Sequence, residues 1–120
     1  MIEVDWHKCV GDIWCSIYRI DANHVNIKGF TGQYIIWSGK FEGERNVLVV
    51  GYGDIRKAII KYRDDIAIKA FEQFGVYITW ADIPGNKKKP INNFLVKRLS
   101  PKMANKLEKG GEIEINLPKW

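Results

Sequence analysis

The sequence predicts a small α/β sandwich in which a three-stranded central sheet is flanked by helices. Three observations support this class. β-Branched and aromatic residues concentrate in three short segments, amphipathic helical patterns follow those segments, and 120 residues provide room for one hydrophobic core rather than two. Hydrophobic residues make up 46% of the chain and charged residues 28%, proportions typical of a globular protein. We therefore expect residues 1–120 to form a single domain.

The first two predicted strands form a hairpin. The segment GQYIIWSG, residues 32–39, is rich in β-branched and aromatic residues, and VLVVGYG, residues 47–53, is almost continuously apolar. The polar residues 40–46 between them include Gly43 and are typical of a turn. Because it is so apolar, the second strand is expected to be buried on both faces. Residues 13–20 are a further candidate for a strand or an extended packing segment.

A helix is predicted directly after the hairpin. Ile55, Ile59 and Tyr62 recur at helical spacing on one face, and Asp54 is placed to cap the first turn. Residues 66–74 suit a second short helix that ends at a glycine.

The remainder of the chain contains the third strand and two more predicted helices. Residues 76–83, VYITWADI, have strand character, and Pro90 can stand in the first turn of a helix that runs to Leu99. Residues 100–110 repeat this pattern, with a serine as cap, a proline in the first turn and a glycine as stop. The tail, residues 112–120, is expected to be extended.

The N-terminal residues bear on the compartment. Met1 to Lys8 contain acidic residues and a tryptophan where a signal peptide would have a basic start and an apolar core, which predicts a cytoplasmic protein. In that compartment Cys9 and Cys15 are expected to be free thiols. They also lack the second ligand pair of a zinc site, so no metal role is expected for them. No stretch approaches the roughly 18 consecutive apolar residues of a membrane span, so no membrane partner is predicted.

The net charge of +5 and the pI near 9.2 favour binding to phosphate groups. Such lysine-rich segments could equally be an ordinary solvated surface. The basic residues gather in two parts of the chain. The first group follows Asp54 and comprises Arg56, Lys57, Lys61 and Arg63. The second lies in the C-terminal third and comprises Lys87, Lys88, Lys89, Lys97, Arg98, Lys102, Lys106 and Lys109.

Four short motifs, in order and at similar spacing, resemble the GIY-YIG nuclease superfamily. In this chain they read GQYIIW, GYGDIRKAI, YITWA and INLPKW. A bacterial single-domain subgroup of the superfamily has GVYIIW, GQGNIRDRL, YVTWA and VNLPW in the same order. The likeness spans roughly residue 6 to the end of the chain. It implies the same small α/β sandwich and, in an intact member, metal-dependent cleavage of DNA.

The catalytic positions of the superfamily are mostly substituted in this chain. In that superfamily a first-motif tyrosine activates or positions the attacking water, a helical arginine steadies the phosphate, and a glutamate holds one divalent metal ion. Tyr34 matches that tyrosine. The second-motif tyrosine falls on Val49, the arginine on Ala58 and the glutamate on Asn92. Arg56 matches only a non-catalytic basic residue of the superfamily.

Two further superfamily positions complete the comparison. A histidine that is common one turn after the arginine falls on Tyr62, and a late asparagine is retained as Asn116. The neutral amide of Asn92 is a poorer Mg²⁺ ligand than a carboxylate, so a Mg²⁺ cofactor is expected only if the chain is an active nuclease. Tyr34 has a second interpretation, because an aromatic residue on a central strand is commonly part of the core.

Three functions remain open at this point. An active endonuclease would need relocated residues, with Arg56 or Lys57 replacing the arginine and Glu42 or Glu44 replacing the glutamate. The chain could instead be a protein–protein interaction module. The interpretation favoured by the substitutions is a non-catalytic module that binds nucleic acid, DNA in particular. Its phosphate contacts would come from the first basic group: Arg56, Lys57, Lys61 and Arg63.

Overall fold

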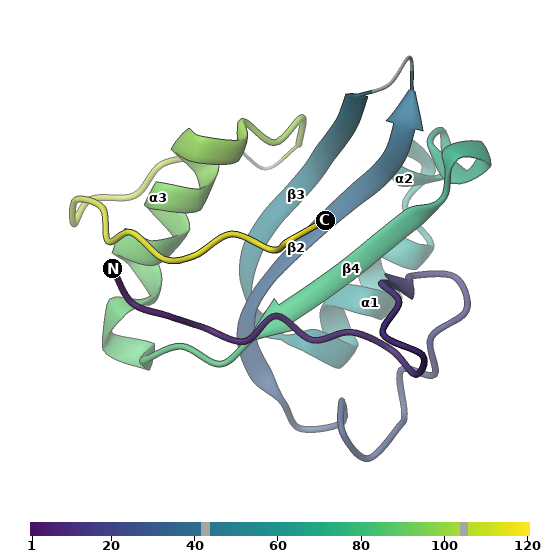
Figure 1. The fold of residues 1–120 in the computed structure, drawn as a ribbon, viewed down its shortest axis with the longest axis horizontal. Helices are drawn as coiled ribbons and strands as arrows, with labels where there is room; N and C mark the ends of the chain where they lie inside the picture. The colour runs from purple at the N-terminus through teal and green to yellow at the C-terminus, as the bar shows by residue number, and fades with distance from the viewer. Residues whose placement is uncertain (42–43, 104–105) are drawn as a thin grey trace.

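An antiparallel sheet forms the centre of the protein (Figure 1). The computed structural model describes residues 1–41, 44–103 and 106–120, and within these residues the sheet has four strands. They are β1 (Cys15–Ser16), β2 (Thr31–Phe41), β3 (Glu44–Asp54) and β4 (Val76–Ala81). Their order across the sheet is β1-β4-β2-β3, so β2 pairs with both β3 and β4.

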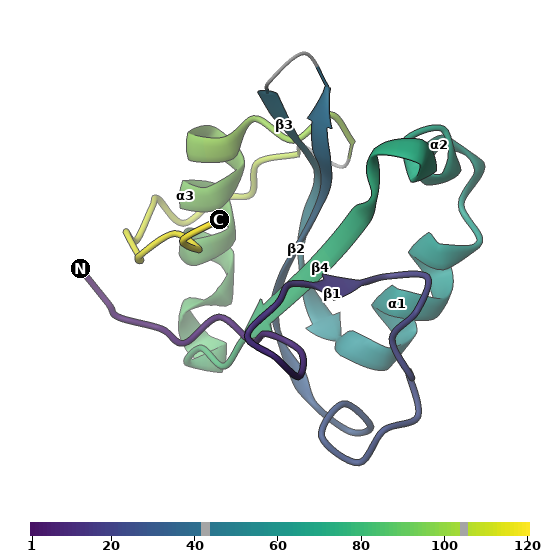
Figure 2. The ribbon, with the colours of Figure 1, turned by 45° about the vertical axis from the view of Figure 1, so that its right-hand side comes forward.

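Helices cover both faces of this sheet. Figure 2 shows α1 and α2 on one side of the strands and α3 on the other. The C-terminal tail crosses the α3 face in front of β2 and β3 (Figure 1). The α/β class predicted from the sequence is therefore confirmed. The helical elements are α1 (Ile55–Arg63), α2 (Ile66–Lys69), α3 (Lys88–Leu99) and the 3₁₀ turns η1 (Glu72–Phe74) and η2 (Gly85–Lys87).

The prediction of three strands is wrong by one short strand. Within residues 13–20, Cys15 and Ser16 pair with Ile78 and Tyr77 of β4 and form the sheet edge β1. The strand ends there because the next residues turn back, with the Arg19 amide donating to the Ser16 carbonyl (3.2 Å). A two-residue strand leaves almost no periodic pattern in a sequence.

The hairpin is longer than predicted. β2 and β3 pair from Thr31–Asp54 to Phe41–Glu44, so polar residues that were expected to form the turn continue the ladder. Glu42 and Gly43 lie outside the described residues. Val49 packs toward α1 and Val50 toward α3, which confirms that this part of the second strand is buried on both faces.

The helix predictions hold in part. Asp54 caps α1, its carboxylate accepting from the Lys57 amide (3.0 Å), and Pro90 lies in the first turn of α3, as expected. Residues 66–74 divide into α2 and η1 rather than forming one helix.

The helix predicted over residues 100–110 is absent from the part of it that the structure describes, 100–103 and 106–110. Ser100 ends α3 in a left-handed conformation (φ 47°). The Lys102 and Met103 amides then donate to the Val47 and Leu48 carbonyls (3.0 and 2.9 Å). These residues pair with the free edge of β3, and this long-range contact outweighs the local helical pattern.

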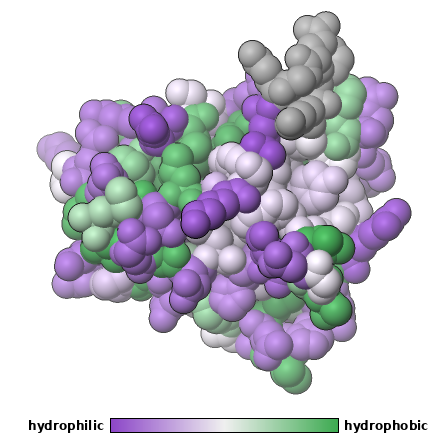
Figure 3. All heavy atoms as spheres, in the orientation of Figure 1, coloured by the Kyte–Doolittle hydropathy of each residue, from purple (hydrophilic) through white to green (hydrophobic). Residues whose placement is uncertain are grey.

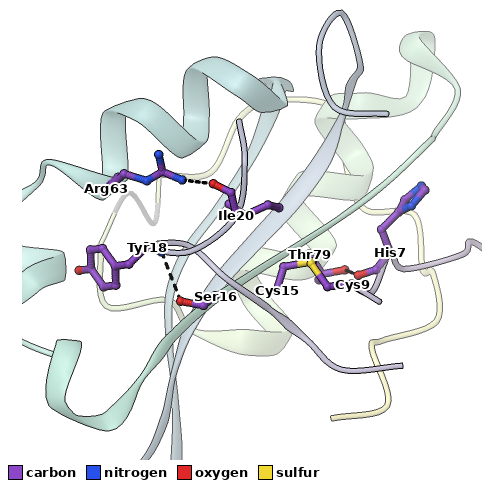
Figure 4. Close-up of a disulfide and its surroundings, with 8 residues drawn as sticks. All are labelled: His7, Cys9, Cys15, Ser16, Tyr18, Ile20, Arg63 and Thr79. Atoms are coloured by element: carbon purple, nitrogen blue, oxygen red, sulfur yellow. Dashed lines mark hydrogen bonds between the residues drawn. A yellow bond between two sulfur atoms is a disulfide. The ribbon is translucent and has the colours of Figure 1, made fainter. Parts of the chain in front are cut away.

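A disulfide joins Cys9 and Cys15, so the expectation of free thiols is wrong (Figure 4). The Cys9 amide donates to the Ile13 carbonyl (2.8 Å), and this turn brings the two cysteine Cα atoms to 5.2 Å. Thr79 of β4 donates its hydroxyl to the His7 carbonyl (2.8 Å) and holds the adjacent chain. Disulfides are commoner in oxidising compartments than in the cytoplasm, so the cytoplasmic location stays a prediction.

No helix in the described part of the chain has the length and apolar character needed to cross a membrane.

Reduction of the Cys9–Cys15 disulfide should lower the free energy of unfolding by about 2 kcal/mol, because the short loop it closes gains conformational freedom in the unfolded chain. Urea denaturation with and without a thiol reductant, followed by tryptophan fluorescence, measures this difference. The matched control is the Cys9→Ser/Cys15→Ser variant, whose midpoint should not respond to the reductant. An unmodified protein whose midpoint is equally insensitive would contradict the prediction.

Candidate functional site

Four of the positions matched to the superfamily gather on the α1 face of the sheet. Tyr34 comes from β2, Val49 from β3, and Ala58 and Tyr62 from α1, and all four belong to one hydrophobic cluster. Val49 is fully buried, while Ala58 and Tyr62 are each 8% exposed. The positions that would hold a second tyrosine and an arginine are therefore filled by hydrocarbon in a packed core.

Tyr34 lies across the backbone of the neighbouring strand. It pairs in register with Gly51 of β3. A Cβ atom on Gly51 would lie 2.5 to 2.7 Å from the hydroxyl oxygen, Cζ and Cε2 of Tyr34, closer than real contacts allow. Gly51 is thus required for the tyrosine ring to approach the strand, a use typical of glycine within strands.

The hydroxyl of Tyr34 is held in its neutral form. Its ring lies 6.3 Å from the Tyr62 ring, measured between centroids. Burial raises the pKa of Tyr34 well above its ordinary value, and the charge and hydrogen bonding of the Tyr62 hydroxyl raise it further. The raised pKa favours the protonated hydroxyl at neutral pH, the form that donates a hydrogen bond rather than the phenolate that would accept a proton.

Asn92 lies on the opposite, α3, face of the sheet. Its side-chain oxygen accepts from the Nε2 amide of Gln33 (3.0 Å), which also donates to the Gly51 carbonyl (2.7 Å). Gln33 and Tyr34 are neighbours on β2 and point to opposite faces. The side-chain amide of Gln33 therefore links Asn92, the residue matched to the superfamily's glutamate, to the backbone of Gly51. The sheet separates Asn92 from Ala58 and Tyr62.

Gln33 is the residue of this site that the sequence analysis missed. It is fully buried, and its Oε1 atom has no hydrogen-bond partner among the described residues. A buried amide oxygen without a partner is costly. The available signal was a glutamine inside an otherwise apolar strand, directly before the motif tyrosine.

Asn116 joins the C-terminal tail to the N-terminal segment by hydrogen bonds. Its side chain accepts from the Val4 amide (2.6 Å) and donates to the Val4 carbonyl (2.8 Å), and its own carbonyl accepts from the Trp6 indole (2.9 Å). Both ends of the Asn116 amide are thus used to bind the N-terminal segment to the tail. This contact lies on the α3 side, because Val4 and Trp6 pack against the cluster on that face.

The cations of α1 are engaged to different degrees. Arg63 donates to the Ile17 carbonyl (2.8 Å) and the Ile20 carbonyl (Figure 4). It therefore anchors the loop after β1. Arg56 donates to the Asn23 side chain (2.8 Å), whereas Lys57 is exposed.

Lys61 is exposed, and its ammonium lies 5.0 Å from the centre of the Tyr62 ring. Three of the four cations of the first basic group, Arg56, Lys57 and Lys61, thus keep a charge at or near the surface, and Arg63 has a packing role.

Glu44, one of the two acids considered as replacements for the glutamate, lies far from this site. It starts β3, and Gly51 lies seven positions further along the strand, which at about 3.3 Å per residue places their Cα atoms about 23 Å apart. Glu42 lies outside the described residues. In the described part of the chain, no group of three or more His, Cys, Asp or Glu side chains is arranged to hold a metal ion.

Comparisons of this chain with protein-family models, with curated proteins and with solved structures found no match. The resemblance to the GIY-YIG superfamily therefore rests on the four sequence motifs alone.

The contact between Tyr34 and Gly51 gives a direct test of the site geometry. A Gly51→Ala substitution should lower the free energy of unfolding by about 1–3 kcal/mol, because the added methyl group overlaps the tyrosine ring. Chemical denaturation measures this loss. In a Tyr34→Ala background the same substitution should cost much less, and the coupling between the two changes isolates the contact. Equal losses in both backgrounds would show that the ring does not lie over Gly51.

Proposed function

We propose that this chain is a non-catalytic nucleic-acid-binding module with a GIY-YIG-like fold. The observation that carries the proposal is the state of the catalytic positions. Val49 and Ala58 are neutral residues packed in a core, and the amide of Asn92 is hydrogen bonded to Gln33. Fold likeness alone does not imply function, so the argument depends on these side chains.

The chemistry that the superfamily performs needs charges that these positions do not supply. Hydrolysis of a phosphodiester builds negative charge on the phosphate, which a metal ion and a cation must stabilise. An alanine methyl group has no charge to contribute. Asn92 offers a neutral oxygen that already accepts a hydrogen bond. The neutral Tyr34 hydroxyl cannot take a proton from water.

Binding to nucleic acid requires fewer precisely placed groups than cleavage of its backbone does. Exposed cations attract the phosphate backbone without defined geometry, and the net charge of +5 favours that encounter. Lys57 and Lys61 on α1 and the lysines near the start of α3 are exposed. These charges support DNA as the partner.

A second candidate function, a protein–protein interaction module, is favoured by one observation. An open cavity of about 920 Å³ lies between residues 9–20 and 72–77, beside the disulfide. Its lining includes Ile13, which is 62% exposed, together with Trp14 and Tyr77. Exposed apolar surface of this kind can accept a peptide. DNA-binding measurements separate the two candidates.

The nucleic-acid proposal predicts binding that depends steeply on salt. Affinity for a short DNA duplex, measured by fluorescence anisotropy, should fall steeply between about 50 and 200 mM salt, because each phosphate contact releases counterions. Absence of binding even at the lowest salt would remove this proposal and favour the interaction module.

The same proposal predicts that the unmodified chain does not cut DNA in the presence of Mg²⁺ or Mn²⁺. The missing metal ligand and the missing cation should each cost about 3 kcal/mol or more in transition-state stabilisation. A nicking assay on supercoiled plasmid measures the rate. Cleavage that is abolished by Glu42→Ala or Glu44→Ala, but is insensitive to changes at Asn92, would establish an endonuclease with relocated residues.

Restoration of the substituted residues gives the complementary measurement. Asn92 and Ala58 lie on opposite faces of the sheet, so Asn92→Glu combined with Ala58→Arg should introduce weak metal-dependent nicking only if the two new side chains reach one phosphate at the end of the sheet. Val49→Tyr would complete the superfamily set, but Val49 is fully buried, so the ring must displace core side chains. The double variant changes one buried position, Ala58, rather than two, so it is the better first test, with Ala58→Gln/Asn92→Gln as its uncharged control.

A further inference from the structure

We infer that the nucleic-acid backbone is bound chiefly by a lysine surface at the start of α3, rather than along α1. This inference rests on the proposed function and names the contact surface for it. The lysine surface consists of Lys87, Lys88, Lys89 and Lys109.

Two distant segments of the chain form this surface. Lys87 ends the turn η2, and Lys88 and Lys89 are the first residues of α3. Lys109 reaches the same place through the loop after α3. The buried amide of Asn93 fixes that loop, donating to the Glu108 and Gly111 carbonyls (2.6 and 2.9 Å).

The surface is hollowed between the two segments. A cavity of about 360 Å³ lies here, and its lining includes Lys88, Lys89 and Lys109. Gly85 and Gly110 also line it and contribute no side chain. Lysines from both segments therefore line one open cavity, a place for a phosphate of the nucleic acid.

The charge of this surface is not neutralised within the described part of the chain. All four lysines are exposed, and the ion pairs there are Lys97–Glu112 and Lys8–Asp12. Glu112 of the adjoining loop is thus already paired, and Glu108 alone leaves the group strongly positive. In Figure 3 the lower left of the molecule, where α3 begins (Figure 1), shows hydrophilic side chains beside hydrophobic ones.

Two of the four cations of α1 are already engaged, which leaves Lys57 and Lys61 as the exposed lysines of that helix. Arg63 is hydrogen bonded to two backbone carbonyls and Arg56 to Asn23. Lysines that make no such contacts can reorient toward phosphates, and they do so as point charges.

The lysine surface also adjoins the candidate site. The Lys88 ammonium lies 5.3 Å from the centre of the Tyr52 ring, and Tyr52 follows Gly51 on β3. Asn92 lies one helical turn after Lys88 on α3. A strand held by these lysines would therefore pass the position where the superfamily binds its metal ion.

Two variants that remove the same number of charges test the inference. The first is Lys87→Gln/Lys88→Gln/Lys89→Gln, and the matched control is Arg56→Gln/Lys57→Gln/Lys61→Gln on α1. Affinity for a short DNA duplex is measured by fluorescence anisotropy over about 50 to 200 mM salt. At about 50 mM salt the affinity of the first variant for DNA should be about tenfold lower or more. The slope of the logarithm of its affinity against the logarithm of salt concentration should flatten by about 0.9 for each lost phosphate contact. The control should change far less.

A single Lys109→Gln variant tests the contribution of the second segment. It should flatten the slope by about 0.9, although it is far from the lysine run in sequence. Circular dichroism and thermal midpoints should be unchanged in all three variants, since the substituted side chains lie at the surface.

The outcomes separate this inference from the proposed function. Equal losses in the two triple variants, or a larger loss in the α1 variant, would overturn the lysine surface while DNA binding stands. An unmodified chain that does not bind DNA would overturn both. A selective loss in the Lys87–Lys89 variant, together with an effect at Lys109, would support the surface as drawn.

Discussion

The pairing of β2 on both of its edges is the constraint on which the rest of the structure depends. β2 is hydrogen bonded to β3 along one edge and to β4 along the other. Its consecutive residues Ile35 and Ile36 are fully buried in the two clusters on opposite faces. Because β3 and β4 are both antiparallel to β2, they run in the same direction, and the helices that follow them begin at the same end of the sheet. This arrangement brings the starts of α1 and α3 to one end of the molecule.

The same strand divides the candidate site. Tyr34 points toward α1 and Gln33 toward α3, and Gly51 of β3 contacts both, through its open Cα on one face and its carbonyl on the other. An active site that used side chains from both α1 and α3 would have to bring them together around Gly51, because the sheet separates the two helices elsewhere. In this chain the side chains there are a neutral tyrosine, an alanine and two amides, which hold the elements together through packing and hydrogen bonds.

Much of the fold could be predicted from the sequence because its signals are local. The hairpin, the Asp54 cap and the proline in the first turn of α3 each depend on a few neighbouring residues. The features that were missed depend on partners far along the chain. The Cys9–Cys15 disulfide needed a turn that pairs Cys9 with Ile13, and the contact between Gln33 and Asn92 needed the packing of α3 on β2. The pattern after Ser100 indicated a helix, yet the open edge of β3 supplied a competing set of hydrogen bonds.

In the described part of the chain, an irregular segment is hydrogen bonded along β3 at one side of the sheet and along β4 at the other, which leaves less open edge for pairing with another chain. Lys102 and Met103 occupy the outer side of β3, and the segment around the disulfide covers β4, where the His7 amide also donates to the Trp80 carbonyl (3.0 Å). Unpaired strand edges are templates for aggregation, so these two segments cover strand edges in addition to placing Cys15 and Met103 in or against the core. The disulfide holds the segment that covers β4. Reduction would therefore loosen this segment first and open the edge of β4 to a strand of another molecule, while the hairpin of β2 and β3 stays paired.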